Sequence, residues 1–297
     1  MFGRFGFMVF GGYMNKSTVS ICGIKIQVES SEPLDDPMFQ SFNTQDITEP
    51  DILVNVYDKE SIEVPKGQVV IDEVFKWTKL EGPENGWSIY FNEEVTGTVL
   101  YRMDVNSSWD KAVVYCNSKI MSPLSAFTGP MGEVLFRNHI LFRKGMVIHA
   151  SAIAWEDKGI LFSAPSGTGK TTQANLWKQH YNARELNGDR PAMRLIDGQP
   201  WVFGSPWSGG RPVYLNESAP IKAIVLLEQA PENKVRELSP IESLPRIMPR
   251  CFLPYYDKEL MKIALDNLEK IVLNTSIYLL QCRPDREAVE LIKQCVK

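Results

Sequence analysis

The sequence predicts a mixed α/β protein in which a β-rich N-terminal module, residues 1–130, precedes a P-loop domain, residues 131–297. Two observations support this fold class. In the first part of the chain, short apolar runs follow one another between turn formers without intervening helices, as in a sheet-forming module. In the second part, strand-like and helix-like runs surround a glycine-rich loop, as in α/β domains.

The N-terminal module is expected to be antiparallel, because strand follows strand without a helix between them. The candidate strands lie between about Val19 and Asn117, and turn-forming residues separate them. They are Val19–Val28, Ile52–Tyr57, Gln68–Ile71, Trp87–Phe91, Gly97–Met103 and Ala112–Cys116.

The P-loop domain is expected to begin at a helix, Met131–Arg143, whose apolar residues have the mixed spacing of a partly buried helix. Two strand-like runs follow, Met146–Trp155 and Gly159–Ser163, joined by a polar turn. The next run, Thr171–Tyr181, lacks proline and glycine and is expected to be a helix. This order places the glycine-rich loop between a strand and a helix.

The remaining elements are predicted from turn and capping patterns. Asp197-Gly198 between apolar runs predicts a hairpin over Met193–Phe203. Ser239 followed by Pro240 and Glu242 has the pattern of a capping box with proline at the first helical position. The other expected elements are a strand at Ile221–Glu228, a helix at Tyr256–Val272, a strand at Ser276–Cys282 and a helix at Pro284–Cys295.

The composition excludes several function classes. The length of 297 residues suits one large domain or two ordinary ones. The hydrophobic fraction of 44% is that of a folded globular protein. The formal net charge of −4 argues against a nucleic-acid partner, because neutralising a phosphate backbone requires an excess of lysine and arginine. No run of about 18 apolar residues is present, so no membrane partner is expected.

The cysteines and the N-terminus indicate a cytoplasmic protein. The five cysteines are scattered and lack the close pairs of zinc sites and redox dithiols, so we expect reduced thiols. The apolar stretch Phe5–Phe10 is short, interrupted by glycine and not followed by a small-residue cleavage site, which disfavours a secretory signal.

The glycine-rich loop matches the P-loop pattern. Residues 164–171 read Ala-Pro-Ser-Gly-Thr-Gly-Lys-Thr and follow the apolar run Ile160–Phe162. Gly167 and Gly169 let consecutive backbone amides turn inward and cradle phosphate oxygens at a helix N-terminus. The expected nucleotide-binding residues are Pro165, Ser166, Gly167, Thr168, Gly169, Lys170, Thr171 and Thr172.

Within this loop each polar side chain has an expected role. Lys170 would reach the β- and γ-phosphates, the hydroxyl of Thr171 would bind Mg²⁺, and Thr172 would contact the α-phosphate. Ala164 stands at a position that is usually glycine, which the looser form of the pattern tolerates. The alternative is a glycine-rich turn that binds nothing, and the strand and helix on either side disfavour it.

Asp189 is the candidate acid. It follows Lys170 at a distance that lets one helix and a returning strand bring it back to the phosphates. A carboxylate there can hold Mg²⁺ or accept the proton of an attacking hydroxyl. The alternative is an ordinary turn aspartate, because Asn187-Gly188-Asp189 is turn chemistry in any protein.

Two further features are candidate parts of the site. His149 lies in an apolar run just before the P-loop strand, where a lone histidine is more often a packed core residue than a catalytic one. The loop Gly204–Arg211 is rich in glycine and tryptophan and ends in a cation, as expected of a substrate lid that binds an anionic group. Its candidate substrate-binding residues are Trp207, Ser208, Gly209 and Arg211.

These residues together resemble the catalytic domain of the HPr kinase/phosphorylase family, which shares a P-loop core with ATP-dependent phosphoenolpyruvate carboxykinases. The resemblance covers Gly145 to about Gln229. It is carried by Ile148-His149-Ala150, the segment 166–172 and the turn Gly188-Asp189. A less characterised HPr-kinase-like branch is also similar, through a Gly-Asp-Arg-Pro turn at 188–191, a Pro-Trp-Ser-Gly loop at 206–209 and Asn216.

The resemblance implies ATP and Mg²⁺ as cofactors and a homo-oligomeric state. It also implies that Asp189 is the catalytic or metal-linked acid and that His149 lies near the transferred phosphate. Two departures from the family indicate an acceptor other than HPr. Arg190 stands where the family carries a second acid, and the glycine-rich signature of true HPr kinases is missing. Arg190 would instead pair with a carboxylate or phosphate of the substrate.

The leading hypothesis is an ATP-dependent kinase with Asp189, His149 and Lys170 as catalytic residues. Its acceptor would be a hydroxyl of a peptide or protein serine, or of a small anionic molecule. Two alternatives stay open. The core and the two cations Arg190 and Arg211 also suit a carboxykinase-like enzyme acting on a small carboxylic acid, and a non-catalytic ATP sensor would share the loop.

Overall fold

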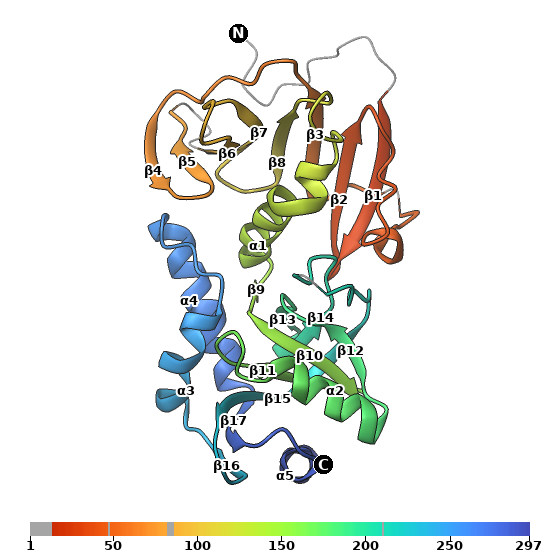
Figure 1. The fold of residues 1–297 in the computed structure, drawn as a ribbon, viewed down its shortest axis with the longest axis vertical. Coiled ribbons are helices and arrows are strands. Elements are labelled where there is room, and N and C mark those ends of the chain that lie inside the picture. The colour runs from red at the N-terminus through yellow and green to blue at the C-terminus, as the bar shows by residue number, and fades with distance from the viewer. Residues whose placement is uncertain (1–13, 47, 82–85, 210) are drawn as a thin grey trace. The chain divides into compact units, whose positions relative to one another are not determined.

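The computed structural model describes residues 14–46, 48–81, 86–209 and 211–297 of the chain. It is a mixed α/β structure with two sheets (Figure 1). Two compact units divide it, Met1–His139 (unit 1) and Ile140–Lys297 (unit 2). The division falls inside helix α1 (Gly132–Phe142), just after the boundary expected at 130/131. In the described ranges, no helix is long and apolar enough to cross a bilayer.

Unit 1 is built on an eight-stranded sheet with the order β1-β2-β3-β8-β7-β6-β5-β4 (Figure 1). The strands are β1 (Asn15–Ile21), β2 (Ile24–Ser30), β3 (Ile52–Asp58), β4 (Gln68–Asp72), β5 (Lys76–Lys79), β6 (Trp87–Asn92), β7 (Val99–Val105) and β8 (Lys111–Cys116). A short 3-10 helix, η1 (Gln40–Phe42), lies between β2 and β3, and η2 (Phe127–Met131) precedes α1.

The antiparallel arrangement expected for this module is wrong at its centre. β3 runs parallel to both β2 and β8, while all other neighbouring strands of this sheet are antiparallel. The reason lies in the connections. The chain crosses over through residues 31–51 between β2 and β3 instead of turning back, and β4 to β7 are inserted between β3 and β8.

The first expected strand, Val19–Val28, is in fact a hairpin of β1 and β2. Cys22 and Gly23 form its turn with φ angles of 55° and 70°, as the tightest hairpin turns require. Cysteine rarely adopts a positive φ, so the residue pattern carried no turn signal there. The other expected strands of unit 1 are confirmed, and β5 was not predicted.

A cluster of tryptophans packs inside unit 1. The rings of Trp77 and Trp87 lie 6.2 Å apart in an edge-to-face arrangement, and Trp109 lies 6.1 Å from Trp77. All three are buried, and aromatic pairs of this geometry contribute beyond the area they bury. His139 is also buried, with Nδ1 3.1 Å from the carbonyl oxygen of Trp109. His139 is therefore a packing residue.

Unit 2 holds a nine-stranded sheet with the order β12-β10-β11-β15-β14-β13-β9, and β17 pairs with both β15 and β16. The strands are β9 (Gly145–Val147), β10 (Ala150–Trp155), β11 (Lys158–Ser163), β12 (Arg184–Asn187), β13 (Ala192–Ile196), β14 (Gln199–Phe203), β15 (Ser218–Gln229), β16 (Lys234–Glu237) and β17 (Ser276–Cys282). The helices are α2 (Lys170–Tyr181), α3 (Pro240–Ile247), η3 (Met248–Arg250), α4 (Lys258–Leu273) and α5 (Arg286–Val296).

Three neighbouring strands of this sheet run in the same direction. β15 is parallel to β11 on one side and to β17 on the other. Their carboxyl ends therefore meet at one edge of the sheet, which is where ligands bind in open α/β sheets. The glycine-rich loop starts at that edge, directly after β11.

Helices α2 and α5 share one hydrophobic core with the strands beneath them. Trp177 of α2 is fully buried, with its ring 5.3 Å from that of Trp155 and 6.4 Å from that of Phe162. Ala288 and Ile292 of α5 belong to the same core. This packing fixes the start of α2 relative to the end of β11, so the loop between them has two rigid anchors.

The turn and capping predictions in unit 2 are confirmed. Asp197 and Gly198 form the β13–β14 turn with φ angles of 50° and 82°. Ser239 and Glu242 make the reciprocal hydrogen bonds of a capping box at the start of α3. The expected single strand Met146–Trp155 is wrong, because β9 pairs with β13 whereas β10 pairs with β11 and β12. The short strands β12 and β16 were not predicted.

Candidate functional site

The loop between β11 and α2 takes its shape from two glycines. Gly167 has φ of 78° and Gly169 has φ of 120°, conformations that other residues rarely adopt. The space where a side chain would lie is open at both positions, so the need for glycine there is conformational. The Thr168 amide donates to the carbonyl of Pro165 at 3.3 Å and closes the turn.

Lys170 is the first residue of α2, and its side chain folds back over this loop. Its Nζ donates to the carbonyl oxygens of Ala164 at 3.0 Å and Pro165 at 3.4 Å. Burial lowers the pKa of the Lys170 amine, the negative charge of Asp189 partly offsets this, and the positive charge of Arg250 lowers the pKa further. An anion bound in the loop would reverse this shift, because it would favour the charged amine.

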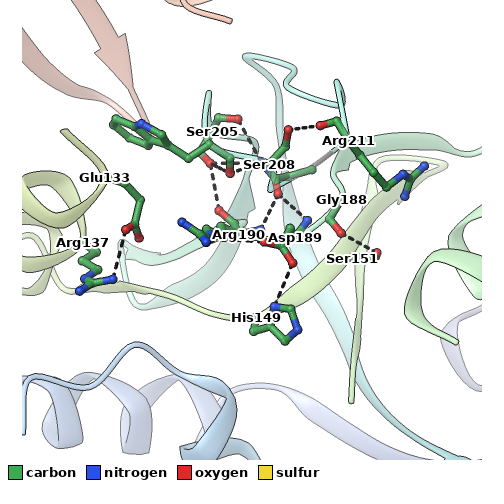
Figure 2. Close-up of polar contacts among 12 residues, drawn as sticks. Glu133, Arg137, His149, Ser151, Gly188, Asp189, Arg190, Ser205, Ser208 and Arg211 are labelled. Atoms are coloured by element: carbon green, nitrogen blue, oxygen red, sulfur yellow. Dashed lines mark hydrogen bonds and ion pairs between the residues drawn. The ribbon is translucent and has the colours of Figure 1, made fainter. Parts of the chain in front are cut away.

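His149 and Asp189 form a hydrogen-bonded pair (Figure 2). Nδ1 of His149 lies 3.0 Å from Oδ1 of Asp189. Because a carboxylate accepts only, this contact places a proton on Nδ1 and leaves the lone pair of the neutral ring on Nε2. The pair therefore combines the Asp189 carboxylate with Nε2 of His149, and both can accept a proton.

Backbone pairing explains why two residues forty positions apart meet. The Ala150 amide donates to the carbonyl of Asp189 at 3.1 Å, which continues the β10–β12 ladder. The His149 amide donates to the carbonyl of Arg250 at 2.7 Å, and the His149 carbonyl accepts from the Ser163 hydroxyl at 2.9 Å. His149 is thus held from both sides, in the break between β9 and β10.

Asp189 is ionised at neutral pH. The hydrogen bond from His149 is the largest cause lowering the pKa of its carboxyl, followed by the charges of His149 and Arg190, and burial opposes these effects only in part. Arg190 Nε lies 3.2 Å from Oδ2, and the Arg190 guanidinium lies 5.7 Å from the ring centre of Phe252. In the structure, Arg190 therefore pairs with the neighbouring acid.

Asn187 braces the Asp189 turn, and sequence reasoning missed this role. Its Oδ1 accepts from the amides of Asp189 at 2.9 Å and Arg190 at 2.7 Å. Its Nδ2 lies 3.0 Å from the carbonyl oxygen of Ser205 and 3.2 Å from that of Trp207. Asn187 is fully buried, so it joins the turn to the following loop with no competition from water. The only available signal was the turn propensity of Asn-Gly.

The loop that contains Trp207 packs on the Asp189 turn. Trp207 is 6% exposed, and the Ser205 hydroxyl lies 2.9 Å from the carbonyl oxygen of Arg190. A side chain at Gly209 would come within 2.7 Å of the Asp189 Oδ2, so only glycine fits against the carboxylate. Ser208 donates to the carbonyl of Arg211, a contact visible in Figure 2. Gly210 lies outside the described residues.

Arg211 reaches the start of α2. It forms a bidentate ion pair with Glu185, at 2.7 Å and 3.1 Å, and its Nη1 lies 3.4 Å from the Thr171 hydroxyl. The Glu185 side chain is 8% exposed and that of Arg211 is 34% exposed, so the pair is partly shielded from water, and its two contacts fix its geometry. Arg211 is therefore a preorganised cation beside Thr171.

One pocket of about 310 Å³ brings most of the expected site residues together. The pocket is lined by His149, Ser166, Gly167, Gly169, Lys170, Thr171, Thr172, Gly188, Asp189, Ser208 and Arg211. Of the expected residues, Pro165, Thr168, Arg190, Trp207 and Gly209 are not among its lining residues.

Two further cavities adjoin this pocket along the loop. A cavity of about 730 Å³ shares Ser166 and Gly167 with it and extends to Arg246 and Arg250 at the end of α3. A cavity of about 330 Å³ shares Gly169 and Thr172 with it and extends to Arg283 after β17. Arg250 is a site residue that sequence reasoning missed, because nothing in its local pattern distinguishes it from a surface arginine.

Comparisons with known proteins add little to this geometry. No protein-family model matches the chain, and no curated protein sequence matches it. The solved structure of the Hpr(Ser) kinase/phosphatase from Coxiella burnetii covers 51% of this chain and 88% of its own length, with 12% sequence identity and a TM-score of 0.32. A likeness of this strength establishes neither family nor activity.

Proposed function

We propose that unit 2 is an ATP-dependent phosphotransferase that moves a phosphoryl group to an acceptor hydroxyl. One observation carries the proposal: Lys170, Thr171 and the His149–Asp189 pair line the same pocket of about 310 Å³. A phosphate-binding loop and an ionised acid that face one cavity are the parts that kinase chemistry requires. The resemblance to HPr-kinase-like proteins, found from the sequence, points the same way.

The proposed division of roles follows the contacts. The loop amides and Lys170 hold the β- and γ-phosphates, and Lys170 with Arg250 stabilises the charge that develops on the transferred group. Asp189 orients the acceptor hydroxyl and draws its proton toward the carboxylate. His149 holds Asp189 through Nδ1 and so orients the carboxylate.

The donor atoms of the pocket fit Mg²⁺. Thr171 offers a hydroxyl and Asp189 a carboxylate, both hard oxygen ligands of the kind that Mg²⁺ binds together with water and substrate phosphates. The ion, when bound, would neutralise charge on the phosphate oxygens. Among the described residues, no group of three or more His, Cys, Asp or Glu side chains is placed to hold a metal.

The two adjoining cavities suggest where the nucleoside and the acceptor bind. The cavity at Thr172 is on the α-phosphate side of the loop and suits the nucleoside. The cavity of about 730 Å³ shares Ser166 and Gly167 with the pocket of the His149–Asp189 pair and reaches Arg250, so it suits the acceptor. This volume accommodates a small molecule or a short peptide segment.

The two alternative functions have less support. The carboxykinase-like alternative rests on two cations that would bind a substrate carboxylate, but Arg211 is already paired with Glu185 and Arg190 with Asp189. An ATP sensor without activity would not need an ionised acid beside the phosphates. Release of carbon dioxide would identify the first alternative, and tight ATP binding without turnover would identify the second.

The test is to incubate the full chain with Mg²⁺, γ-labelled ATP and a pool of cell extract and peptides, and to identify labelled products by mass spectrometry. Asp189→Asn is expected to reduce transfer by about 10³-fold, because it removes the acid and keeps the shape. Nucleotide binding by calorimetry should persist, because Asp189 does not hold the loop.

Asp197→Asn is the matched control for this experiment. Asp197 lies in the β13–β14 turn with φ of 50°, a conformation that asparagine adopts readily, so the same chemical change should leave transfer unaltered. Full transfer by Asp189→Asn would contradict the role of Asp189. Absence of any labelled product from the unmodified chain, with ATP bound, would instead favour the sensor.

A further inference from the structure

The two units carry opposite charge. Residues 1–139 contain 19 acidic and 11 basic side chains, whereas residues 140–297 contain 17 acidic and 21 basic ones. The overall charge of −4 hides this difference. A strongly acidic unit attracts basic partners and repels acidic ones, so unit 1 favours a partner rich in lysine or arginine.

Strand β4 offers a place where such a partner can bind. It lies at the edge of the unit 1 sheet and pairs only with β5, so the backbone groups along its outer side have no strand beside them within the described ranges. An edge strand of this kind accepts an additional strand from another chain, because main-chain hydrogen bonds supply the affinity.

The side chains of β4 are those of a binding edge. Val69 and Val70 are each 44% exposed, and Val74, two residues after the strand, is 71% exposed. The register between Val69 and Ile71 is irregular, which is how two successive valines come to be exposed together. Such edges are usually protected by lysine, proline or a covering segment, and β4 itself contains no lysine or proline.

The charges next to these valines are mainly negative. Residues 66–81 and 86–94 together contain five acidic and three basic side chains. Lys76 is already paired with Asp72, and the charge of Glu94 also acts on Lys76. Asp72 is the last residue of β4 and Glu73 follows it, and both are exposed. Both would face the basic side chains of a strand added to β4.

We propose that the outer edge of β4 is a docking site for an extended peptide segment in which lysine or arginine alternates with branched apolar residues. The segment adds to the sheet as a strand. Its apolar side chains cover Val69 and Val70, and its basic side chains pair with Asp72 and Glu73. This interaction surface goes beyond the proposed phosphotransfer and does not require it.

The test uses the full chain without nucleotide, so that its failure and a failure of the phosphotransfer proposal are separate results. The probe is a short fluorescein-labelled peptide of alternating lysine and valine, and binding is followed by fluorescence anisotropy. Peptides of alternating glutamate and valine, or lysine and proline, are the comparisons. The first has the wrong charge and the second lacks the backbone donors of a strand, so both should bind at least about tenfold more weakly.

Variants locate the binding on β4. Asp72→Lys with Glu73→Lys should weaken the lysine–valine peptide at least about fivefold and strengthen the glutamate–valine peptide. The matched control is Asp35→Lys with Glu49→Lys, which changes the charge equally on exposed residues near the opposite edge of the sheet. Circular dichroism verifies that each variant is folded.

Several outcomes would overturn the proposal. Equal affinity for all three peptides would contradict the proposal. An equal loss of affinity for the lysine–valine peptide in both double variants would indicate only a general charge effect. Concentration-dependent dimers in sedimentation that Val69→Ser with Val70→Ser abolishes would mean that a second copy of this chain occupies the edge. Peptide binding that appears only after deletion of residues 1–13 would assign the edge to the chain's own N-terminal segment.

Discussion

The loop of residues 164–171 and the turn of residues 187–190 both contribute to the lining of one pocket, yet different interactions hold them. The loop takes its shape from its own backbone, through the positive φ angles of Gly167 and Gly169. The turn takes its shape from distant side chains, with Asn187 bonded to the 205–207 segment and Asp189 to His149. A backbone conformation that requires glycine can be recognised in the local sequence, whereas hydrogen bonds between distant residues cannot.

The largest effect on the loop is expected from Gly169→Ala. Alanine strongly disfavours φ of 120°, so the loop must leave its conformation although no atom blocks the added methyl group. We expect nucleotide affinity to fall about 100-fold, or about 2.8 kcal/mol, measured by calorimetry.

Gly198→Ala is the control for this change. Gly198 also has a positive φ, 82°, and open space for a methyl group, but it lies in the β13–β14 turn. Both variants should lose similar stability, and only Gly169→Ala should lose nucleotide affinity. Equal affinities in the two variants would mean that the loop shape is not what binds phosphate.

Asn187→Ala tests the turn, where we expect a loss of stability and of transfer and no loss of nucleotide affinity. The change removes the acceptor of two amides and the donor to the 205–207 segment in a fully buried position. We expect the free energy of unfolding to fall by about 2–3 kcal/mol in chemical denaturation. Transfer should slow because Asp189 is no longer fixed, while nucleotide affinity should be unchanged.

Asn274→Ala provides the reference for Asn187→Ala. The Asn274 side chain is exposed and donates a single hydrogen bond, to the Lys270 carbonyl at 2.8 Å. Its removal should cost less than about 0.5 kcal/mol. A nucleotide affinity that falls in Asn187→Ala as much as the transfer rate would show that loop and turn are coupled, and the contrast between them would not hold.

The smallest expected effect concerns the pH dependence of Asp189. Its carboxyl pKa is lowered chiefly by the hydrogen bond from His149 and less by Arg190. Removing either partner should raise that pKa, so the acid limb of the kcat/KM profile should move to higher pH. The shift should be larger for His149→Gln than for Arg190→Gln, and NMR titration of the Asp189 carboxyl would measure it without activity.

The same shift has a consequence for stability. Because the pKa of Asp189 is lowered in the folded state, its contribution to stability is present above the ordinary carboxyl pKa and is lost as pH falls through the lowered one. Acid unfolding of His149→Gln should therefore lose less stability over this range than the unmodified chain. If the pKa of Asp189 is the same in both variants as in the unmodified chain, neither His149 nor Arg190 lowers it.

Much of the fold could be predicted because its signals are local. The β13–β14 turn and the capping box of α3 depend on residues within a few positions, and both are confirmed. The parallel pairing of β3 with β2 and β8 depends on which distant segments meet, and the expectation of an antiparallel sheet was wrong there. Short strands such as β12 are specified by their neighbours in the sheet and not by their own pattern.

The site divides in the same way. The loop residues, His149 and Asp189 could be selected from type and spacing, and all of them except Pro165 and Thr168 line one pocket. Asn187 and Arg250 could not, because their roles arise from a buried hydrogen-bond network and from the packing of η3 beside His149. Arg190 was expected to meet the substrate, and its observed partner is the acid next to it in the chain.

Gly209 limits how this sequence can diverge. The residue is exposed, and substitution of exposed residues is usually harmless. A side chain at this position, however, would come within 2.7 Å of Oδ2 of Asp189. Position 209 is therefore restricted twice, by the carboxylate at position 189 and by its own φ of 65°. Among homologues, loss of the glycine should accompany loss of the acid, so the two positions together would separate active descendants from inactive ones.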